Sequence, residues 1–126
     1  GPCKAEMPTL ERLQEMYGSR GLKIVAVSID ETASDDSIRT YARNMGLTFE
    51  ILHDPQYRIE QSYQVVGYPE SYVIDGNGVI RKVWLGAADW TSQGNIALVR
   101  QLLGLGGSAS STGATASPGA GAVATR

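Results

Sequence analysis

The sequence contains little of the chemistry on which metal centres and disulfide-bonded folds depend. Its 126 residues include one cysteine, Cys3, and one histidine, His53. A single cysteine excludes a disulfide within the chain and any multi-cysteine metal cage, and one histidine leaves no histidine pair for a zinc site. We therefore expect no metal ligands, and we interpret His53, which is followed by Asp54 and Pro55, as a turn residue.

Charge and long apolar runs are also scarce. The net charge is −2 and 19% of residues are charged, which excludes a basic surface for nucleic acid or for an anionic membrane. No apolar run approaches the ~18 residues needed to span a bilayer. With 42% hydrophobic residues, the chain has enough apolar side chains for the core of one globular domain. Small molecules or proteins are therefore the favoured partners.

The end of the chain differs from the rest in composition. Of the 21 residues at 106–126, 18 are Gly, Ala, Ser or Thr. Such a segment buries too little apolar surface to offset the entropy lost on ordering. We expect one domain over residues 1–105 and a flexible tail over residues 106–126.

Apolar periodicity and turn residues divide the domain into helices and strands. Ser34 and Gly46 are suited to begin and end one of the helices. The turn Asp-Gly-Asn-Gly at residues 75–78 suits a β-hairpin. In chain order we expect a helix at 3–17 with a kink at Pro8, a strand at 22–29, a helix at 34–46, a short strand at 47–51, a helix from 55 to about 63, a hairpin of 71–74 and 79–85, and a helix over 96–103.

This order predicts an α/β fold, because the run at residues 22–29 is rich in β-branched residues, as in a strand buried on both faces of a parallel sheet. The order begins with a helix, whereas a right-handed βαβ unit has a strand before such a helix. We therefore expect that a first core strand is missing from this chain, with its place between strands 22–29 and 71–74. Its absence would expose unpaired backbone, which predicts an unstable or aggregation-prone chain.

The first residues carry a specific motif. Gly-Pro-Cys-Lys-Ala-Glu-Met-Pro at residues 1–8 matches the second half of Trp-Cys-Gly-Pro-Cys-Lys-x-Glu-x-Pro. This segment resembles the TlpA/ResA-like thioredoxin family. The resemblance covers about residues 1–103 and implies a thioredoxin-like three-layer sandwich, a central mixed sheet with helices on both faces. It also implies that the first cysteine of the family motif stands immediately before Gly1. In the other interpretation, Cys3 is an inert cysteine and Gly-Pro is a scar of tag removal.

The chemistry of the motif explains its spacing. Two cysteines separated by two residues at a helix start can close a small disulfide, and the free N–H groups and the helix dipole stabilise a thiolate there. The resemblance implies that the upstream cysteine attacks a substrate disulfide and that Cys3 resolves the mixed disulfide. Pro2 suits the first helical turn, and we count it among the substrate-binding residues.

Glu6 lies three residues after Cys3, on the same helix face. Its carboxylate could exchange protons with the thiols, and the resemblance implies that a glutamate at this place tunes the active site. The alternative is a solvated glutamate that only favours the amino end of the helix.

The second diagnostic segment is Gly67-Tyr68-Pro69-Glu70. A proline directly before a strand has no N–H for the ladder, and a cis Tyr68–Pro69 bond would bend the chain toward the dithiol; an ordinary trans proline is the alternative. In thioredoxin-like proteins the matching loop holds the peptide that flanks the target cysteine, which implies substrate binding by these four residues. Glu70 resembles the Gly-x-Pro-Glu form of the CcmG-like branch, although an exposed carboxylate at a strand start would explain it equally well.

Two further features are interpreted as structural. The segment Gly-Ala-Ala-Asp-Trp at residues 86–90 also resembles family sequences, and it lies before the last expected helix. Trp84 and Trp90 are most simply packing residues of the core or its rim.

The resemblance implies a thiol–disulfide oxidoreductase, acting as a reductant of protein disulfides such as those of apocytochrome c and supplied with electrons by a membrane thiol donor. It also implies an extracytoplasmic or periplasmic location, tethered to the membrane, and no cofactor beyond the redox-active dithiol. A peroxiredoxin would need a Pro-x-x-x-Thr-x-x-Cys loop, which is absent. The alternative class is a non-catalytic thioredoxin-like module that holds peptides in the Pro69 loop. With one thiol, this chain is expected to be inactive as a dithiol enzyme.

Overall fold

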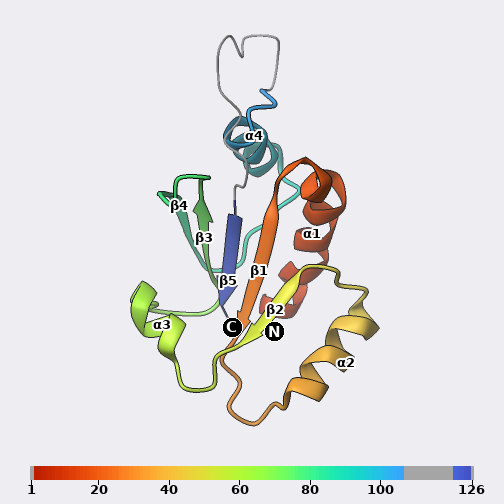
Figure 1. Cartoon of the computed structure of the whole chain (residues 1–126), viewed down its shortest axis with the longest axis vertical. Coiled ribbons are helices and arrows are strands. Elements are labelled where there is room, and N and C mark those ends of the chain that lie inside the picture. The colour runs from red at the N-terminus through yellow and green to blue at the C-terminus, as the bar shows by residue number, and fades with distance from the viewer. Residues whose placement is uncertain (1, 107–120, 126) are drawn as a thin grey trace.

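The computed structural model describes the backbone of residues 2–106 and 121–125 and the side chains of residues 4–106. Helices and strands alternate in the α/β class that the sequence predicts (Figure 1). No helix in these ranges is long and apolar enough to cross a membrane. The elements are α1 (Pro2–Tyr17), the 3-10 turn η1 (Gly18–Arg20), β1 (Lys23–Ser28), α2 (Asp35–Met45), β2 (Glu50–His53), α3 (Arg58–Tyr63), β3 (Glu70–Ile74), β4 (Ile80–Leu85), α4 (Gln93–Leu102) and β5 (Gly121–Thr125).

In the part of the chain that the structure describes, the strands form one mixed sheet of 5 strands in the order β2-β1-β5-β3-β4. Strand β1 runs parallel to both of its neighbours, β2 and β5. Strand β3 runs antiparallel to β4 and to β5. The parallel half of the sheet therefore meets the antiparallel hairpin at β5.

Strand β5 occupies the position at which the sequence predicts a missing core strand. Val123 in its middle pairs with Val25 of β1 and with Tyr72 of β3. The expectation of a flexible tail is therefore wrong for Gly121–Thr125, whereas residues 107–120 and 126 lie outside the described residues. The physical reason is that the facing edges of β1 and β3 have N–H and C=O groups in need of partners, and an uncharged segment of small residues can supply them.

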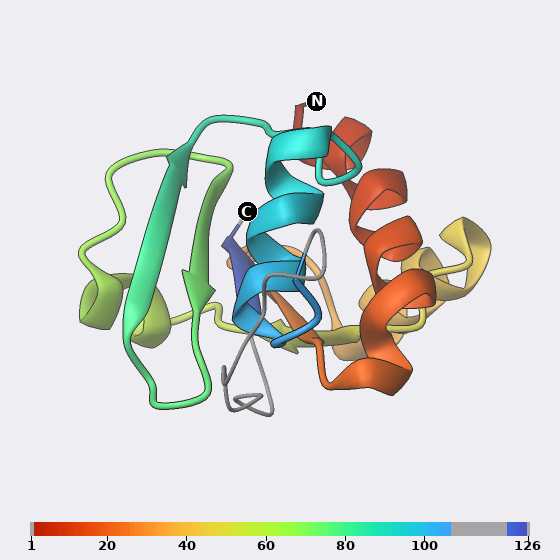
Figure 2. The same ribbon diagram turned by 90° about the horizontal axis from the view of Figure 1, so that it is seen from above.

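Helices cover both faces of the sheet, as the three-layer prediction requires. Val73 of β3 packs in the core with residues of α1 and α4, which lie side by side over one face (Figure 2). Tyr72, the residue before Val73, packs against Tyr63 of α3, with ring centroids 4.9 Å apart and ring planes tilted by 57°. Because successive side chains of a strand point to opposite faces, α3 lies on the face opposite α1 and α4.

The hydrophobic core lies between the sheet and the helices α1 and α4. Its largest fully buried side chain is Trp90. The core comprises Met7, Leu10, Leu13, Tyr17, Leu22, Ile24, Ala26, Phe49, Val73, Trp90, Val99, Leu102 and Leu103.

Local capping signals place α2 where the sequence predicts it. The Ser34 hydroxyl accepts a hydrogen bond from the Ser37 N–H, and the Ser37 hydroxyl accepts one from the Ser34 N–H, which closes a capping box. Gly46 ends the helix at φ 67°, in the left-handed region that favours glycine.

Two neighbouring elements begin later than expected. The N–H of Leu47 donates to the carbonyl of Ala42 and so belongs to the end of α2, which delays β2 to Glu50. Helix α3 begins at Arg58, not at residue 55, because the carboxylate of Asp54 accepts hydrogen bonds from its first N–H groups, including that of Arg58 at 2.9 Å.

Candidate active site

The amino end of α1 carries a buried carboxylate. Glu6 is 2% exposed, and its Oε2 accepts hydrogen bonds from the backbone N–H of Ala88 at 2.8 Å and from the indole N–H of Trp90 at 3.2 Å. Burial raises the pKa of the Glu6 carboxyl, and the two hydrogen bonds oppose this rise because they stabilise the charged form. The alternative of a solvated glutamate is therefore wrong.

The two oxygens of Glu6 have different surroundings. Oε1 is buried and has no hydrogen-bond partner among the described residues. Cys3 lies in the first turn of the same helix, one turn before Glu6. A carboxyl with one oxygen unpartnered among the described residues can accept or release a proton at that oxygen, and its raised pKa makes it a better proton acceptor than an ordinary glutamate. The side chains of Pro2 and Cys3 lie outside the described residues, so the structure places these residues by backbone only.

Residues 86–90, which precede α4, are hydrogen-bonded to α1. The Thr9 hydroxyl donates to the Glu6 carbonyl at 2.8 Å and accepts from the Trp90 N–H at 3.2 Å. Trp90 is 0% exposed. The packing role expected for Trp90 holds, but sequence reasoning missed its hydrogen bond to Glu6, because no spacing pattern links residues this far apart. The family-like sequence of residues 86–90 was the only signal.

The same segment contacts the second motif. The Tyr68–Pro69 peptide bond is cis, so the alternative of an ordinary trans proline is wrong. The carbonyl of Pro69 accepts a hydrogen bond from the N–H of Gly86 at 2.9 Å. Residues 86–90 therefore bridge the two motifs, with Gly86 on the Pro69 loop and Ala88 on Glu6.

The carboxylate of Glu70 is directed to its own loop. Glu70 is 3% exposed, so it is not the exposed carboxylate that one interpretation of the sequence predicts. Its Oε2 accepts from the Val66 N–H at 2.9 Å, and its Oε1 accepts from the Tyr72 hydroxyl at 2.6 Å. Burial and the Glu70 carboxylate raise the pKa of Tyr72. Glu70 thus links the start of the loop, at Val66, to Tyr72 within β3.

Gly67 and Tyr68 lie at the open side of this loop. A Cβ atom added to Gly67 would meet no atom of the described residues within 4 Å. Tyr68 is 44% exposed, and its hydroxyl donates to Oε1 of Glu60. Loss of hydration and the Glu60 carboxylate raise the pKa of Tyr68 to about 12. The loop therefore presents surface on which another chain can lie.

A pocket of about 230 Å³ lies beside the first turn of α1. No residue of α2 is buried, and this pocket separates α2 from β1 and α1. The sequence did not predict it. Its lining comprises Lys4, Met7, Ala26, Val27, Ser28, Asp30, Ala33, Ser37, Ile38, Tyr41 and Ile51.

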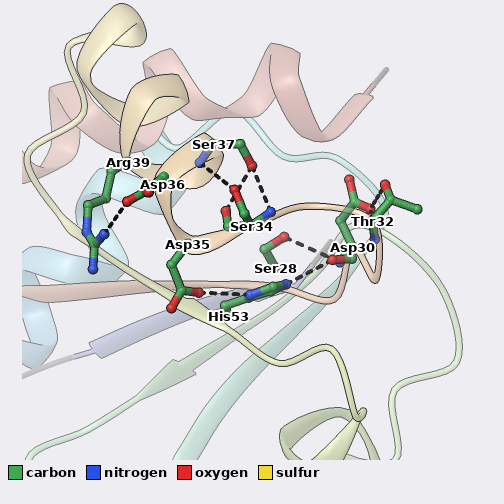
Figure 3. A network of polar contacts seen from close by, with 9 residues as sticks. All are labelled: Ser28, Asp30, Thr32, Ser34, Asp35, Asp36, Ser37, Arg39 and His53. Carbon is green, nitrogen blue, oxygen red and sulfur yellow. Dashed lines mark hydrogen bonds and ion pairs between the residues drawn. The ribbon is translucent and has the colours of Figure 1, made fainter.

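His53 joins three elements near this pocket (Figure 3). Its Nδ1 lies 3.1 Å from Oδ1 of Asp35 in α2, and its Nε2 lies 2.9 Å from the carbonyl oxygen of Asp30 after β1. These two acceptors raise the pKa of His53, the Asp30 carbonyl most strongly. His53 is therefore not a turn residue: it is the last residue of β2, and its ring contacts both Asp35 of α2 and Asp30 after β1. No group of three or more candidate metal ligands occurs within the described ranges.

The fold and the site together define a class. A mixed sheet, a helix that begins at the cysteine motif and a Pro69 loop before an antiparallel strand are features of thioredoxin-like proteins. The chain belongs to the AhpC/TSA family, whose model matches residues 1–83.

Relatives of known name are consistent with this membership. The chain is 38% identical over 86 residues to the thioredoxin-like protein YneN of Bacillus subtilis. The matched region covers 68% of this chain and 49% of that protein. It is 34% identical over 85 residues to the thiol-disulfide oxidoreductase ResA of Geobacillus kaustophilus, with coverage of 68% and 48%. The chain thus spans about half the length of the curated relatives it matches.

Solved structures confirm the predicted thioredoxin-like fold. A Chlorobium tepidum structure described as a thiol:disulfide interchange protein, DsbE, matches with a TM-score of 0.66 at 27% identity, over 83% of this chain and 71% of that one. StoA from Bacillus subtilis matches with a TM-score of 0.60 at 24% identity, over 70% of this chain and 66% of StoA. At this identity the match is evidence for the fold and not for the activity.

Proposed function

We propose that the protein is a thiol–disulfide oxidoreductase that reduces disulfides of other proteins, with Cys3 as its resolving cysteine. One observation carries the proposal: one turn after Cys3, the helix buries a carboxyl group of raised pKa with one oxygen unpartnered among the described residues. Burying such a group without function costs stability, and thiol exchange needs a proton acceptor at this place. The names of the relatives support the same reaction class.

In the proposed reaction, a cysteine immediately before Gly1 attacks a client disulfide as a thiolate. A new S–S bond forms, the client disulfide breaks, and one client sulfur leaves as a thiolate that takes up a proton. Cys3 then loses its proton to Glu6 and attacks the sulfur of the upstream cysteine. A new S–S bond forms within the protein, the mixed disulfide breaks, and the second client sulfur leaves as a thiolate that takes up a proton, so that the client is fully reduced. The amino end of α1 stabilises the Cys3 thiolate.

The proposed contacts for the client chain are Pro2, in the first turn of α1, and the Pro69 loop, which comprises Gly67, Tyr68, Pro69 and Glu70. No atom of the described residues lies within 4 Å of a Cβ atom added to Gly67, and Tyr68 is exposed. Glu70 is buried and accepts a hydrogen bond from the Val66 N–H, which stabilises the loop. A client backbone lying along this loop would place its cysteine near the amino end of α1.

Finer features of the proposal come from family resemblance. The clients include apocytochrome c, a membrane thiol protein supplies electrons, and the protein works outside the cytoplasm tethered to a membrane. The dithiol itself is the redox group.

The proposal is tested by trapping the mixed disulfide. A chain extended by Trp-Cys before Gly1 and carrying Cys3→Ser should accumulate a covalent adduct with a disulfide-containing peptide, measured by mass spectrometry. The extended chain that keeps Cys3 should resolve the adduct and release reduced peptide. Peptide binding without any adduct in the folded Cys3→Ser protein would reject the enzyme and favour the non-catalytic peptide-binding module.

A further inference from the structure

Among the described residues, those that hold the carboxylate of Glu6 all lie on one side of it. Both hydrogen bonds to its side chain reach Oε2, and both come from residues 86–90. Neither donor titrates, because one is a backbone N–H and the other an indole N–H. Oε1 has no partner among the described residues.

We propose that Trp90 is a positioning residue, which together with the Ala88 N–H fixes Oε2 of Glu6 and leaves Oε1 as the oxygen that exchanges a proton with Cys3. This inference rests on the proposed function, in which Glu6 receives the Cys3 proton. In this step one proton passes from Cys3 to Glu6, so that the Cys3 thiol becomes a thiolate and the Glu6 carboxylate becomes a carboxylic acid.

The surroundings of Trp90 fit a positioning role. Its side chain is fully buried, so the indole N–H has no water to bind and its direction is fixed by packing. Its backbone N–H is tied to the Thr9 hydroxyl, which in turn donates to the Glu6 carbonyl. Trp90 is therefore linked to the Glu6 turn of α1 by both its backbone and its side chain.

The two donors also set how readily Glu6 takes up a proton. A hydrogen bond to a charged carboxylate favours ionisation, while burial disfavours it, and in Glu6 burial is the larger effect. Removing the indole N–H should move the balance further toward the protonated acid. Glu6 would then accept the Cys3 proton only at higher pH.

The test is a pH titration of the full chain, with glutamate carboxyl carbons labelled with 13C and followed by NMR. Glu6→Gln assigns the Glu6 resonance. In Trp90→Phe, which keeps the ring and removes the N–H, the Glu6 midpoint should rise by about one pH unit, since a bond to a charged group is worth roughly a tenfold change in ionisation. The alkylation rate of Cys3 by iodoacetamide should shift in pH in parallel. Trp84→Phe is the matched control, because the indole N–H of Trp84 donates to Asn95.

An unchanged Glu6 midpoint in folded Trp90→Phe, or a Cys3 alkylation profile that superimposes on that of the wild type, would overturn the proposal. The wild-type chain gives a second test that does not depend on the folding of a variant: the Trp90 indole resonance should titrate with the Glu6 midpoint, and a resonance that ignores it also overturns the proposal. Failure of the proposed function is distinguishable, because it appears as an absence of peptide adduct while the Glu6 titration still responds to Trp90.

Discussion

The indole N–H of Trp90 donates to Oε2 of Glu6 at 3.2 Å, which joins two residues that are 84 positions apart. One belongs to the helix of the cysteine motif, and the other precedes the last helix of the domain. Because the N–H of Gly86 also binds the carbonyl of Pro69, the segment at 86–90 brings the cysteine helix and the Pro69 loop into one site. The site is therefore a product of the whole fold and not of either motif alone.

His53 should make the stability of the chain depend on pH. Both ring nitrogens face oxygen acceptors, and only the protonated ring can donate to both. The pKa of His53 is raised in the folded state, so its stabilising effect is fully present below the unfolded value of about 6.5 and is lost as pH rises through the folded value. The melting temperature of the wild type should exceed that of His53→Gln at pH 5.5, and the difference should shrink toward pH 8.

The control for this titration is Asp36→Asn. Asp36 is in the same helical turn as Asp35 but pairs with Arg39 and has a side chain that is 93% exposed. This variant should keep the pH dependence, whereas Asp35→Asn should weaken it. A difference in melting temperature between the wild type and His53→Gln that stays constant from pH 5.5 to 8 would show that protonation of His53 does not stabilise the fold.

Tyr72→Phe should destabilise the chain by about 1–3 kcal/mol, because it leaves a buried carboxylate of Glu70 without the hydroxyl that donates to it at 2.6 Å. Tyr68→Phe is the matched change at an exposed site and should cost less than about 0.5 kcal/mol. Urea denaturation of the two variants and the wild type measures both. Equal effects of the two substitutions would show that the Glu70–Tyr72 bond does not hold the Pro69 loop.

Val123→Pro should destabilise the chain by about 1–3 kcal/mol, because proline removes an N–H from the central strand and leaves its partner carbonyl without a donor. Val123→Ala keeps the N–H and separates the backbone effect from that of the side chain. Hydrogen exchange should show lost protection in β1 and β3, the two partners of β5. Unchanged protection of these strands in Val123→Pro would show that β5 is not required between them.

Elements with local signals could be predicted from the sequence. Helix α2 depends on Ser34 and Gly46, which act on the turns next to them, and the structure has both caps. The spacing of Cys3 and Glu6 likewise depends on a single helical turn. Strand β2 begins later than its alternating hydrophobicity predicts, because Leu47 completes the end of α2.

Features that depend on distant partners could not be predicted. A Gly- and Ala-rich segment has no strand signal of its own. Strand β5 forms because the backbone groups at the edges of β1 and β3 need hydrogen-bond partners, and this segment pairs with both. The inward direction of Glu70 is set by Val66 and Tyr72, and the bond from Trp90 to Glu6 exists only after α1 and residues 86–90 have packed.

The central claim is that Cys3 is the resolving half of a dithiol. The most direct test is the rate of insulin reduction by the chain extended with Trp-Cys before Gly1, compared with the chain of the present sequence. We expect sustained turnover by the extended chain and negligible turnover by the present one, because one thiol cannot resolve its own mixed disulfide. Equal turnover by the two folded proteins would contradict it.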